Sequence, residues 1–404
     1  MRTDFVRIPF QHPLRAGLPA MKLREFMNRR EIAEIRRRFQ PDKSAISLIR
    51  GCYVNEKREI VSVFNRPLLS FPQEEAEKYL ALFRRVLSGA PGKNLVEMTF
   101  RPDQVMDGEE HRLLSAMRNT ALKVDEGVEA FYQKVIDALE LEGNYLILLT
   151  HDAYDLPYRT RDELKVDDAS EEVFDYIVCC VCPVKLSRPA LSYYAEDNEF
   201  HDRELDWVVA APELGFMFPA FDDRAANIYS ALYYTRDTAD MHDDFVSAVF
   251  NTDSPMPAEA QRETFQALLE DAVGDDLSYD VVQSVHEQIR ERVEEQKSDR
   301  DAEPAAVTKR EVRDMLESCG VPEERVSAFE EKFDAEFGAA HSLTAQNIVE
   351  TRKFEVRTPD VVIQVNPERS DLIETRVIDG FKYILIRADE GVAVNGVNIN
   401  IHEN

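Results

Sequence analysis

The stretches Asn-Tyr-Leu-Ile-Leu-Leu-Thr-His-Asp (144–152) and Tyr-Ile-Val-Cys-Cys-Val-Cys-Pro-Val (176–184) are densely apolar. Each is far shorter than the roughly 20 apolar residues that cross a membrane, and each has the length of a buried β-strand. A third stretch, Phe-Pro-Ala-Phe-Asp-Asp-Arg (218–224), ends in two acids and an arginine. These stretches predict the central strands of a sheet, with the reactive side chains at its rim.

The surrounding sequence predicts a mixture of helices and strands. Apolar residues at helical spacing indicate helices at 25–39, 73–87, 109–121, 126–141 and within 239–296. Further strands are expected at 45–54 and 59–64, joined as a hairpin, and at 205–210 and 228–234. We therefore predict an α+β fold whose larger domain has a mixed β-sheet with packed helices.

The C-terminal third predicts smaller units. A polar, proline-containing linker is expected at 298–308. A helical pair follows at 309–338, with Gly320 and Gly338 at its C-caps. Asp379-Gly380 and Asn395-Gly396 are strong hairpin signals, so 339–404 is expected to form a small antiparallel β module of five or six strands. The main domain is then 21–297, and residues 1–20 favour an extended or disordered tail.

Charge and cysteine content indicate the compartment and the partners. The 404-residue chain carries a net charge of −28, yet residues 1–60 hold 14 Lys+Arg against 7 Asp+Glu. So acidic a protein is not expected to bind nucleic acid, because it repels the phosphate backbone. The basic segment could contact an acidic partner, contact the acidic remainder of the chain, or form a solvated helix face. Five cysteines in an arrangement unsuited to disulfides predict a cytoplasmic protein. Because no apolar run is long enough to cross a membrane, we also expect the protein to be soluble.

The candidate site joins the ends of two apolar runs. His151, Asp152 and Asp155 follow one run, and Asp222, Asp223 and Arg224 follow another. Clustered carboxylates with a histidine suit a divalent metal or an acid/base pair. The alternative is structural: Asp152 and Asp155 cap turns, and Arg224 neutralises a neighbouring aspartate. Neither a bound cofactor nor a complete set of metal ligands can be assigned.

Three other features have structural interpretations that we prefer. On a strand, Cys180 and Cys182 share one face and Cys179 takes the other, which favours packing over a zinc site. The fragment Ser88–Asn94 lacks the spacing and hydroxyl of a phosphate-binding loop, and a helix C-cap at Gly89 explains it better. Trp207, in a strand-like run, is expected in the core.

Several of these motifs resemble those of a bacterial family, domain-of-unknown-function family 4317. The resemblance covers residues 27–297 and 309–398 and implies no catalytic assignment. It rests on these segments: Arg30–Ile35, Gly51–Val54, Leu87–Gly89 with Gly92–Leu95, Gly143–Leu149 leading into His151-Asp152, Cys182–Val184, Phe218–Phe221 and Thr358–Gly380.

Two functions of different classes follow from the sequence. The favoured one is a cytoplasmic interaction or scaffold protein with a protein partner, because no catalytic motif is complete and the charge is asymmetric. The alternative is a metal-dependent hydrolase or phosphotransfer enzyme that uses the His/Asp cluster. Substrate, pathway and oligomeric state are not fixed by the sequence.

Overall fold

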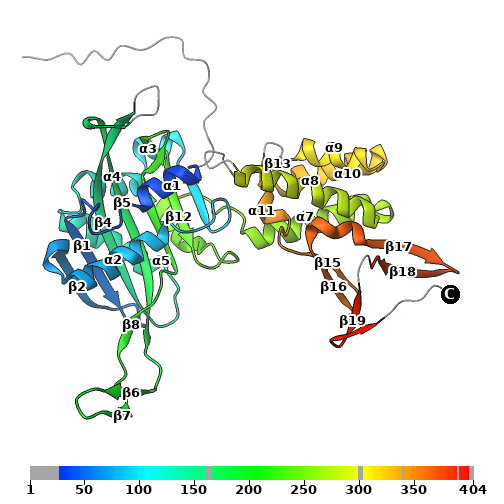
Figure 1. The fold of residues 1–404 in the computed structure, drawn as a ribbon. Helices are drawn as coiled ribbons and strands as arrows, with labels where there is room; N and C mark the ends of the chain where they lie inside the picture. The colour runs from blue at the N-terminus through cyan, green and yellow to red at the C-terminus, as the bar shows by residue number, and fades with distance from the viewer. Residues whose placement is uncertain (1–26, 160–164, 299–303, 339–340, 389–390, 400–404) are drawn as a thin grey trace, which may run out of the picture.

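The computed structural model describes residues 27–159, 165–298, 304–338, 341–388 and 391–399 (Figure 1). Its main feature is an eight-stranded sheet in the order β2-β1-β4-β5-β9-β12-β3, with β8 paired to β5. Every pairing between these strands is antiparallel. The strands are β1 Leu48–Val54, β2 Ile60–Pro67, β3 Leu95–Thr99, β4 Asn144–Arg159, β5 Lys165–Leu186, β8 Trp207–Val209, β9 Leu214–Phe218 and β12 Ser230–Thr235.

The α+β class is confirmed, and the sheet is antiparallel where a mixed sheet was expected. Several of the paired strands are neighbours in the sequence. Strands β1 and β2 form the predicted hairpin, and β4 and β5 pair directly as neighbours in the sequence. Parallel pairs need a long crossover connection, but here the long connections, from β1 to β4 and from β3 to β12, also join antiparallel partners.

Helices cover both faces of the sheet. On the α2 side lie α1 (Arg29–Arg36) and α2 (Gln73–Val86), and on the α5 side lie α4 (Glu109–Asn119), α5 (Asp125–Ala138) and α6 (Asp243–Phe250) (Figure 1). Because β4 and β5 are covered on both sides, their residues are apolar almost without alternation over 145–150 and 176–182. The short helix α3 (Pro102–Asp107) follows β3.

The cysteines divide between the two faces as the strand period predicts. Cys180 and Cys182 belong to the core on the α2 side, and Cys179 belongs with Cys52 to the core on the α5 side. All four are buried and free. Burial raises the pKa of Cys52 to about 11 and that of Cys179 and Cys180 well above its ordinary value. Cys52, Cys179 and Cys180 are therefore protonated thiols, and all four cysteines pack as small apolar side chains.

A second core is helical. It is formed by α7 (Ala258–Val273), α8 (Tyr279–Ser298), α9 (Lys309–Ser318) and α10 (Glu323–Glu336). The last two are the predicted helical pair, and Gly320 and Gly338 follow them with positive φ as expected for C-caps. The predicted boundary at residue 297 stays a prediction, and residues 299–303 of the expected linker lie outside the described residues, as does the expected tail 1–20.

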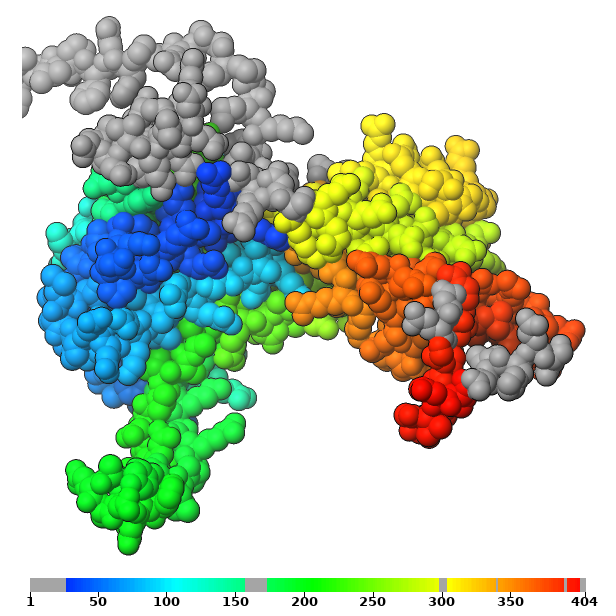
Figure 2. Space-filling view, in the orientation of Figure 1, coloured from blue at the N-terminus to red at the C-terminus, as the bar shows by residue number. Residues whose placement is uncertain are grey.

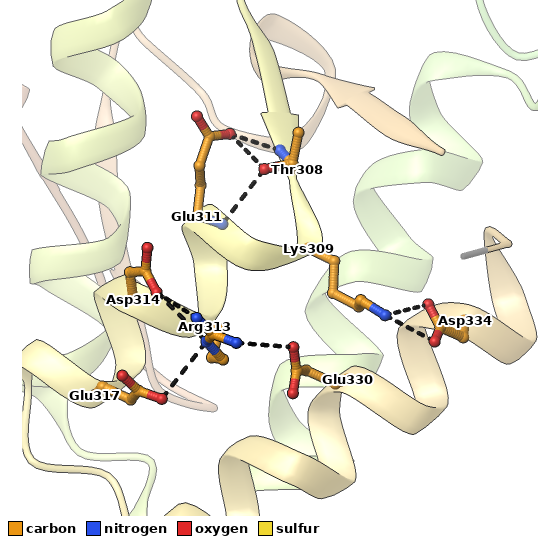
Figure 3. A network of polar contacts seen from close by, with 8 residues as sticks. All are labelled: Thr308, Lys309, Glu311, Arg313, Asp314, Glu317, Glu330 and Asp334. Atoms are coloured by element: carbon orange, nitrogen blue, oxygen red, sulfur yellow. Dashed lines mark hydrogen bonds and ion pairs between the residues drawn. The ribbon is translucent and has the colours of Figure 1, made fainter. Parts of the chain in front are cut away.

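Charged side chains fix the start of α9 and its contact with α10 (Figure 3). Thr308 and Glu311 form a capping box, in which the Thr308 N–H donates to Glu311 at 2.7 Å. Lys309 Nζ lies 2.7 Å from Asp334, and Arg313 lies 3.7 Å from Glu330. These pairs are partly exposed, so each adds at most about 1 kcal/mol and serves mainly to set the register of the two helices.

The C-terminal strands form separate pairs, where one small sheet was expected. Asp379-Gly380 and Asn395-Gly396 do make hairpin turns with positive φ, as predicted. The strands attach to α8 through buried Phe354 and the Tyr279 hydroxyl, which lies 3.0 Å from the Ser370 carbonyl. The pairs are β15 Phe354–Arg357 with β16 Val362–Val365, β17 Ile373–Ile378 with β18 Phe381–Ile386, and β19 Val392–Val394 with β20 Val397–Ile399.

The two cores meet at a junction held by Asn347. This residue lies in the short helix α11 (Ala345–Ile348), after the strand pair β13 (Ala306–Thr308) and β14 (Ser342–Thr344). The buried Asn347 Nδ2 donates to the Gly92 carbonyl at 2.7 Å and to Gln261 at 3.1 Å. One amide therefore links the loop before β3 to helix α7.

Gly215 gives a test of the packing between β9 and its neighbours. A Cβ added at Gly215 would lie 2.4 Å from the Cys179 carbonyl oxygen and 2.7 Å from Val86 Cγ2. Gly215→Ala should therefore lower the free energy of unfolding by about 1–3 kcal/mol in urea titrations. Gly127→Ala in α5, where the added methyl meets only an ordinary contact, should raise it by up to about 1 kcal/mol. Equal effects of the two changes would contradict this packing.

Candidate functional site

The predicted residues His151, Asp152 and Asp155 all lie within β4. The strand continues to Arg159 and does not end at the expected point. Neighbouring strand residues face opposite sides, so His151 and Asp152 point away from each other. His151 Nε2 lies 3.5 Å from Asp175, and Asp155 is exposed. Burial lowers the pKa of His151, while the charges of Asp175 and Asp152 raise it.

Asp152 is buried on the α2 side, and its carboxylate accepts hydrogen bonds from three protein groups. Arg38 Nε donates at 3.1 Å, the Ala45 N–H at 3.0 Å and the Tyr176 hydroxyl at 2.7 Å. Burial, and then the charge of Asp152, holds the pKa of Tyr176 well above its ordinary value, so the phenol remains a donor. A buried carboxylate requires such a shell. The arrangement ties the segment after α1 to the centre of the sheet.

The residues Asp222, Asp223 and Arg224 form a tight corner. Asp222 ends β10 (Ala220–Asp222), and β11 (Ala225–Asn227) follows after two residues with positive φ, Asp223 and Arg224. This is the backbone of a type I′ hairpin turn, which asparagine, aspartate and glycine favour.

Helix α1 connects this corner to Asp152. The Asp223 N–H donates to Glu31 at 3.0 Å, and Arg224 lies 2.9 Å from Glu34. Glu34 also accepts from the Tyr154 hydroxyl at 2.8 Å, and the Arg38 guanidinium lies over the Tyr154 ring. The predicted residues Asp152, Asp223 and Arg224 thus share one polar network, whereas His151 and Asp155 are not among its contacts.

The sequence did not indicate the members that α1 and the segment after it supply. Arg38, Glu31 and Glu34 were seen only as part of a basic helical segment, for which contact with the acidic body was one alternative. Within the described residues, no group of three or more His, Cys, Asp or Glu side chains is placed to hold a metal ion.

A large cleft lies at the junction of the two cores. Its volume is about 820 Å³, within the range of ligand sites. One wall comes from β3 and its flanks, including Val96, Glu97 and Phe100. The opposite wall comes from β13, β14 and the residue before β14, with Leu343 and His341 among the lining side chains.

Glu97 gives the cleft a titratable group. The pKa of its carboxyl is raised to about 7, mainly by burial and in smaller part by the charges of Asp222 and Glu31. Hydrogen bonds from Ser230 and from the Met27 N–H, at 3.2 Å, act in the opposite direction. Asp222 belongs to β10, Glu31 to α1 and Ser230 to β12, and Met27 directly precedes Asn28, the N-cap residue of α1. No sequence motif indicated this residue, because its environment is assembled from distant segments.

A second unusual surface is the arm, residues 186–209, which extends β5 and β8 beyond the sheet (Figures 1 and 2). The arm contains the strand pair β6 (Leu191–Tyr194) and β7 (Glu199–Asp202). Trp207, expected in the core, is 58% exposed, so that prediction is wrong. The apolar run Trp207–Val209 is a strand, but no helix or sheet of the described residues buries it. Leu191 and Phe200 are 71% and 67% exposed.

The hydrogen bonds to the Asp152 carboxylate predict that mutations at two nearby aspartates differ greatly in their effect on stability. Asp152→Asn should lower the free energy of unfolding by about 3 kcal/mol, because Arg38 loses the partner of a mostly buried ion pair. Asp155→Asn, three residues along the same strand but exposed, should change it by less than about 0.5 kcal/mol. Chemical denaturation at pH 7 measures both. Similar small effects would show that the Asp152 contacts do not stabilise the fold.

The raised pKa of Glu97 predicts a pH dependence. The unfolded chain releases this proton near pH 4.5 and the folded chain near pH 7. The folded state therefore binds more protons between these values, and its stability falls as pH rises through them. Glu97→Gln should lose less stability than wild type between pH 5 and pH 8, as measured by urea midpoints. Glu129→Gln, an exposed position on α5, should keep the wild-type slope.

Residues 27–397 match the family described as "Domain of unknown function (DUF4317)". No curated protein matches the chain. Among the described residues, no helix is long and apolar enough to cross a membrane. The match extends over nearly the whole chain and confirms the resemblance seen in the sequence motifs. The chain therefore belongs to the DUF4317 family.

Proposed function

We propose that this chain is a cytoplasmic interaction or scaffold protein that binds a protein partner through the arm. The observation that carries the proposal is a two-stranded projection whose aromatic and aliphatic side chains face solvent. An isolated two-stranded hairpin is only marginally stable in water, and large exposed apolar patches mark interaction sites.

The pairing of the arm organises these side chains into faces. Leu186 lies opposite Trp207, and the same register continues to Tyr193 opposite Phe200. The Tyr193 and Phe200 ring centroids are 5.4 Å apart. Side chains two residues apart share a face, so Leu186 and Trp207 form one exposed apolar strip with Val209, beside the buried Val184. Such a strip can receive the apolar core of an interface, where tryptophan and tyrosine contribute most of the binding energy.

Charge and cysteine chemistry support the same proposal. The acidic body argues against a nucleic-acid partner, and the four strand cysteines are buried free thiols, which suits a reducing compartment. The alternative, a metal-dependent hydrolase or phosphotransfer enzyme built on the His/Asp cluster, has weaker support. The carboxylate of Asp152 is engaged by Arg38, Ala45 and Tyr176, and His151 faces the other side of the sheet.

The test compares the arm with an equally exposed position elsewhere. The double variant Leu186→Ser with Trp207→Ser removes the strip, and Leu69→Ser removes an isolated side chain that is 97% exposed. Purification from the native cytoplasm should recover a stoichiometric protein partner with wild type and Leu69→Ser. The arm variant should bind the purified partner at least about thirtyfold more weakly, as expected for loss of a tryptophan hot spot.

Two outcomes would overturn the proposal. One is a wild-type protein that is recovered as a monomer without partner. The other is an arm variant that keeps full affinity while its thermal melting matches wild type. Because Leu186 and Trp207 are exposed, both variants should fold normally.

A further inference from the structure

We propose that the cleft at the junction is a peptide-binding groove, in which an extended segment of a partner protein adds as an antiparallel strand to the free edge of β3. The site is separate from the arm, and it does not depend on the function proposed for the arm. The preferred segment has a lysine or arginine flanked by apolar residues. The argument rests on the edge of β3, the lining of the cleft and the place of Glu97.

Strand β3 is the last strand of the sheet, and among the strands of the described residues it pairs only with β12. The Phe100 N–H donates to the Tyr229 carbonyl at 2.7 Å, and the Thr235 N–H donates to the Asn94 carbonyl at 3.1 Å. Antiparallel pairing alternates between residues that bond the neighbouring strand and residues that point away from it. Even-numbered residues of β3 therefore bond β12, and the backbone groups of Glu97 and Thr99 point to the open edge.

These outward groups lie along the cleft. Both Glu97 and Thr99 line it, and among the described residues neither has a backbone partner on this edge. Leu95, the remaining outward residue, is already bonded to Ala90 and Gly92. An open edge of this kind is a template for strand addition, in which main-chain hydrogen bonds give affinity and pockets select side chains.

The side chains around the edge define the sequence of such a segment. A residue opposite Glu97 in an antiparallel pair places its side chain on the same face as Glu97, so a basic side chain there forms a cross-strand ion pair. The residues on either side of it face the other way, toward Val96, Phe100 and Met256 of the lining. An alternating apolar–basic–apolar pattern therefore matches both faces.

The junction also preforms the groove. Asn347 fixes the loop before β3 to α7, and Thr344 of β14 lies against Gly92, where an added Cβ would be 2.9 Å from its side chain. The opposing wall is thus held at a set distance from the edge strand. A preformed groove avoids part of the ordering cost of binding.

The probe is the peptide fluorescein-Gly-Gly-Thr-Val-Lys-Val-Thr-amide, which carries the dye on its N-terminal amine and leaves the lysine side chain charged. Its Thr-Val-Lys-Val-Thr core reads the same in both directions, and it is titrated with the full chain by fluorescence anisotropy. Methylation of the lysine backbone nitrogen removes the amide that would donate to the Glu97 carbonyl. Methylation of the following valine nitrogen changes an amide that points away from β3. The first should weaken binding at least about tenfold, and the second by less than about threefold.

Protein variants give an independent test. Thr99→Pro removes the N–H of residue 99, which points to the open edge, and leaves the hydrogen bonds between β3 and β12 intact. Edge strands tolerate proline at such a position. Thr99→Val keeps that amide and is the matched control. Binding should fall at least about tenfold in the first and remain close to wild type in the second. Glu97→Gln should reduce the preference for lysine over norleucine at the central position.

The proposal is overturned if the two methylated peptides bind equally well, or if Thr99→Pro binds like Thr99→Val. Either result would mean that the groove contacts only side chains and adds no strand. Absence of binding by the unmodified peptide would also overturn it. The peptide comparison uses the unaltered protein, so its outcome does not depend on whether Thr99→Pro folds normally.

Discussion

The fold depends on the burial of β4 and β5 on both faces. Strands covered on two sides must be apolar almost throughout, and polar groups within them must find partners inside the protein. Asp152 is the polar residue in β4 for which this requirement is most severe. Its contacts with Arg38, Ala45 and Tyr176 hold the segment after α1 against the sheet. Helix α1 in turn organises the corner formed by Asp223 and Arg224.

The two unusual surfaces, the arm and the cleft, lie at the edges of the sheet and of the helices that cover it. The arm is the part of the β5 hairpin that extends beyond the helices, so its apolar side chains are not buried by any described element. The cleft is found at the last strand, β3, where the sheet ends and the helical core begins. Both surfaces therefore arise from the limits of the main core, and each offers a different type of contact. The arm presents side chains, and the edge of β3 presents backbone groups.

Local signals in the sequence were sufficient for much of the fold. The hairpin turns at Asp379-Gly380 and Asn395-Gly396, and the division of Cys179 and Cys180 between two faces, follow from turn chemistry and strand period. Trp207 was mispredicted because an apolar strand has the same sequence pattern whether or not a layer covers it. Whether a helix or a second sheet buries a strand depends on the tertiary structure.

The candidate site was less predictable for a related reason. The rim residues were chosen by their place after apolar runs, but the groups that contact them come from α1 and the segment after it, more than a hundred residues away in sequence. Glu97 carries no local signal at all. Its raised pKa results from burial and from charges supplied by separate segments, and such convergence is visible only in three dimensions.

The continuity of β5 into the arm has a mechanical consequence. The hydrogen bonds of an antiparallel ladder lie perpendicular to the strands, and β5 is bonded to β4 along most of its length and to β9 on its other side. A force applied at the arm along the strand direction therefore loads many of these bonds simultaneously in shear. Tension applied to the arm is therefore carried into the centre of the sheet.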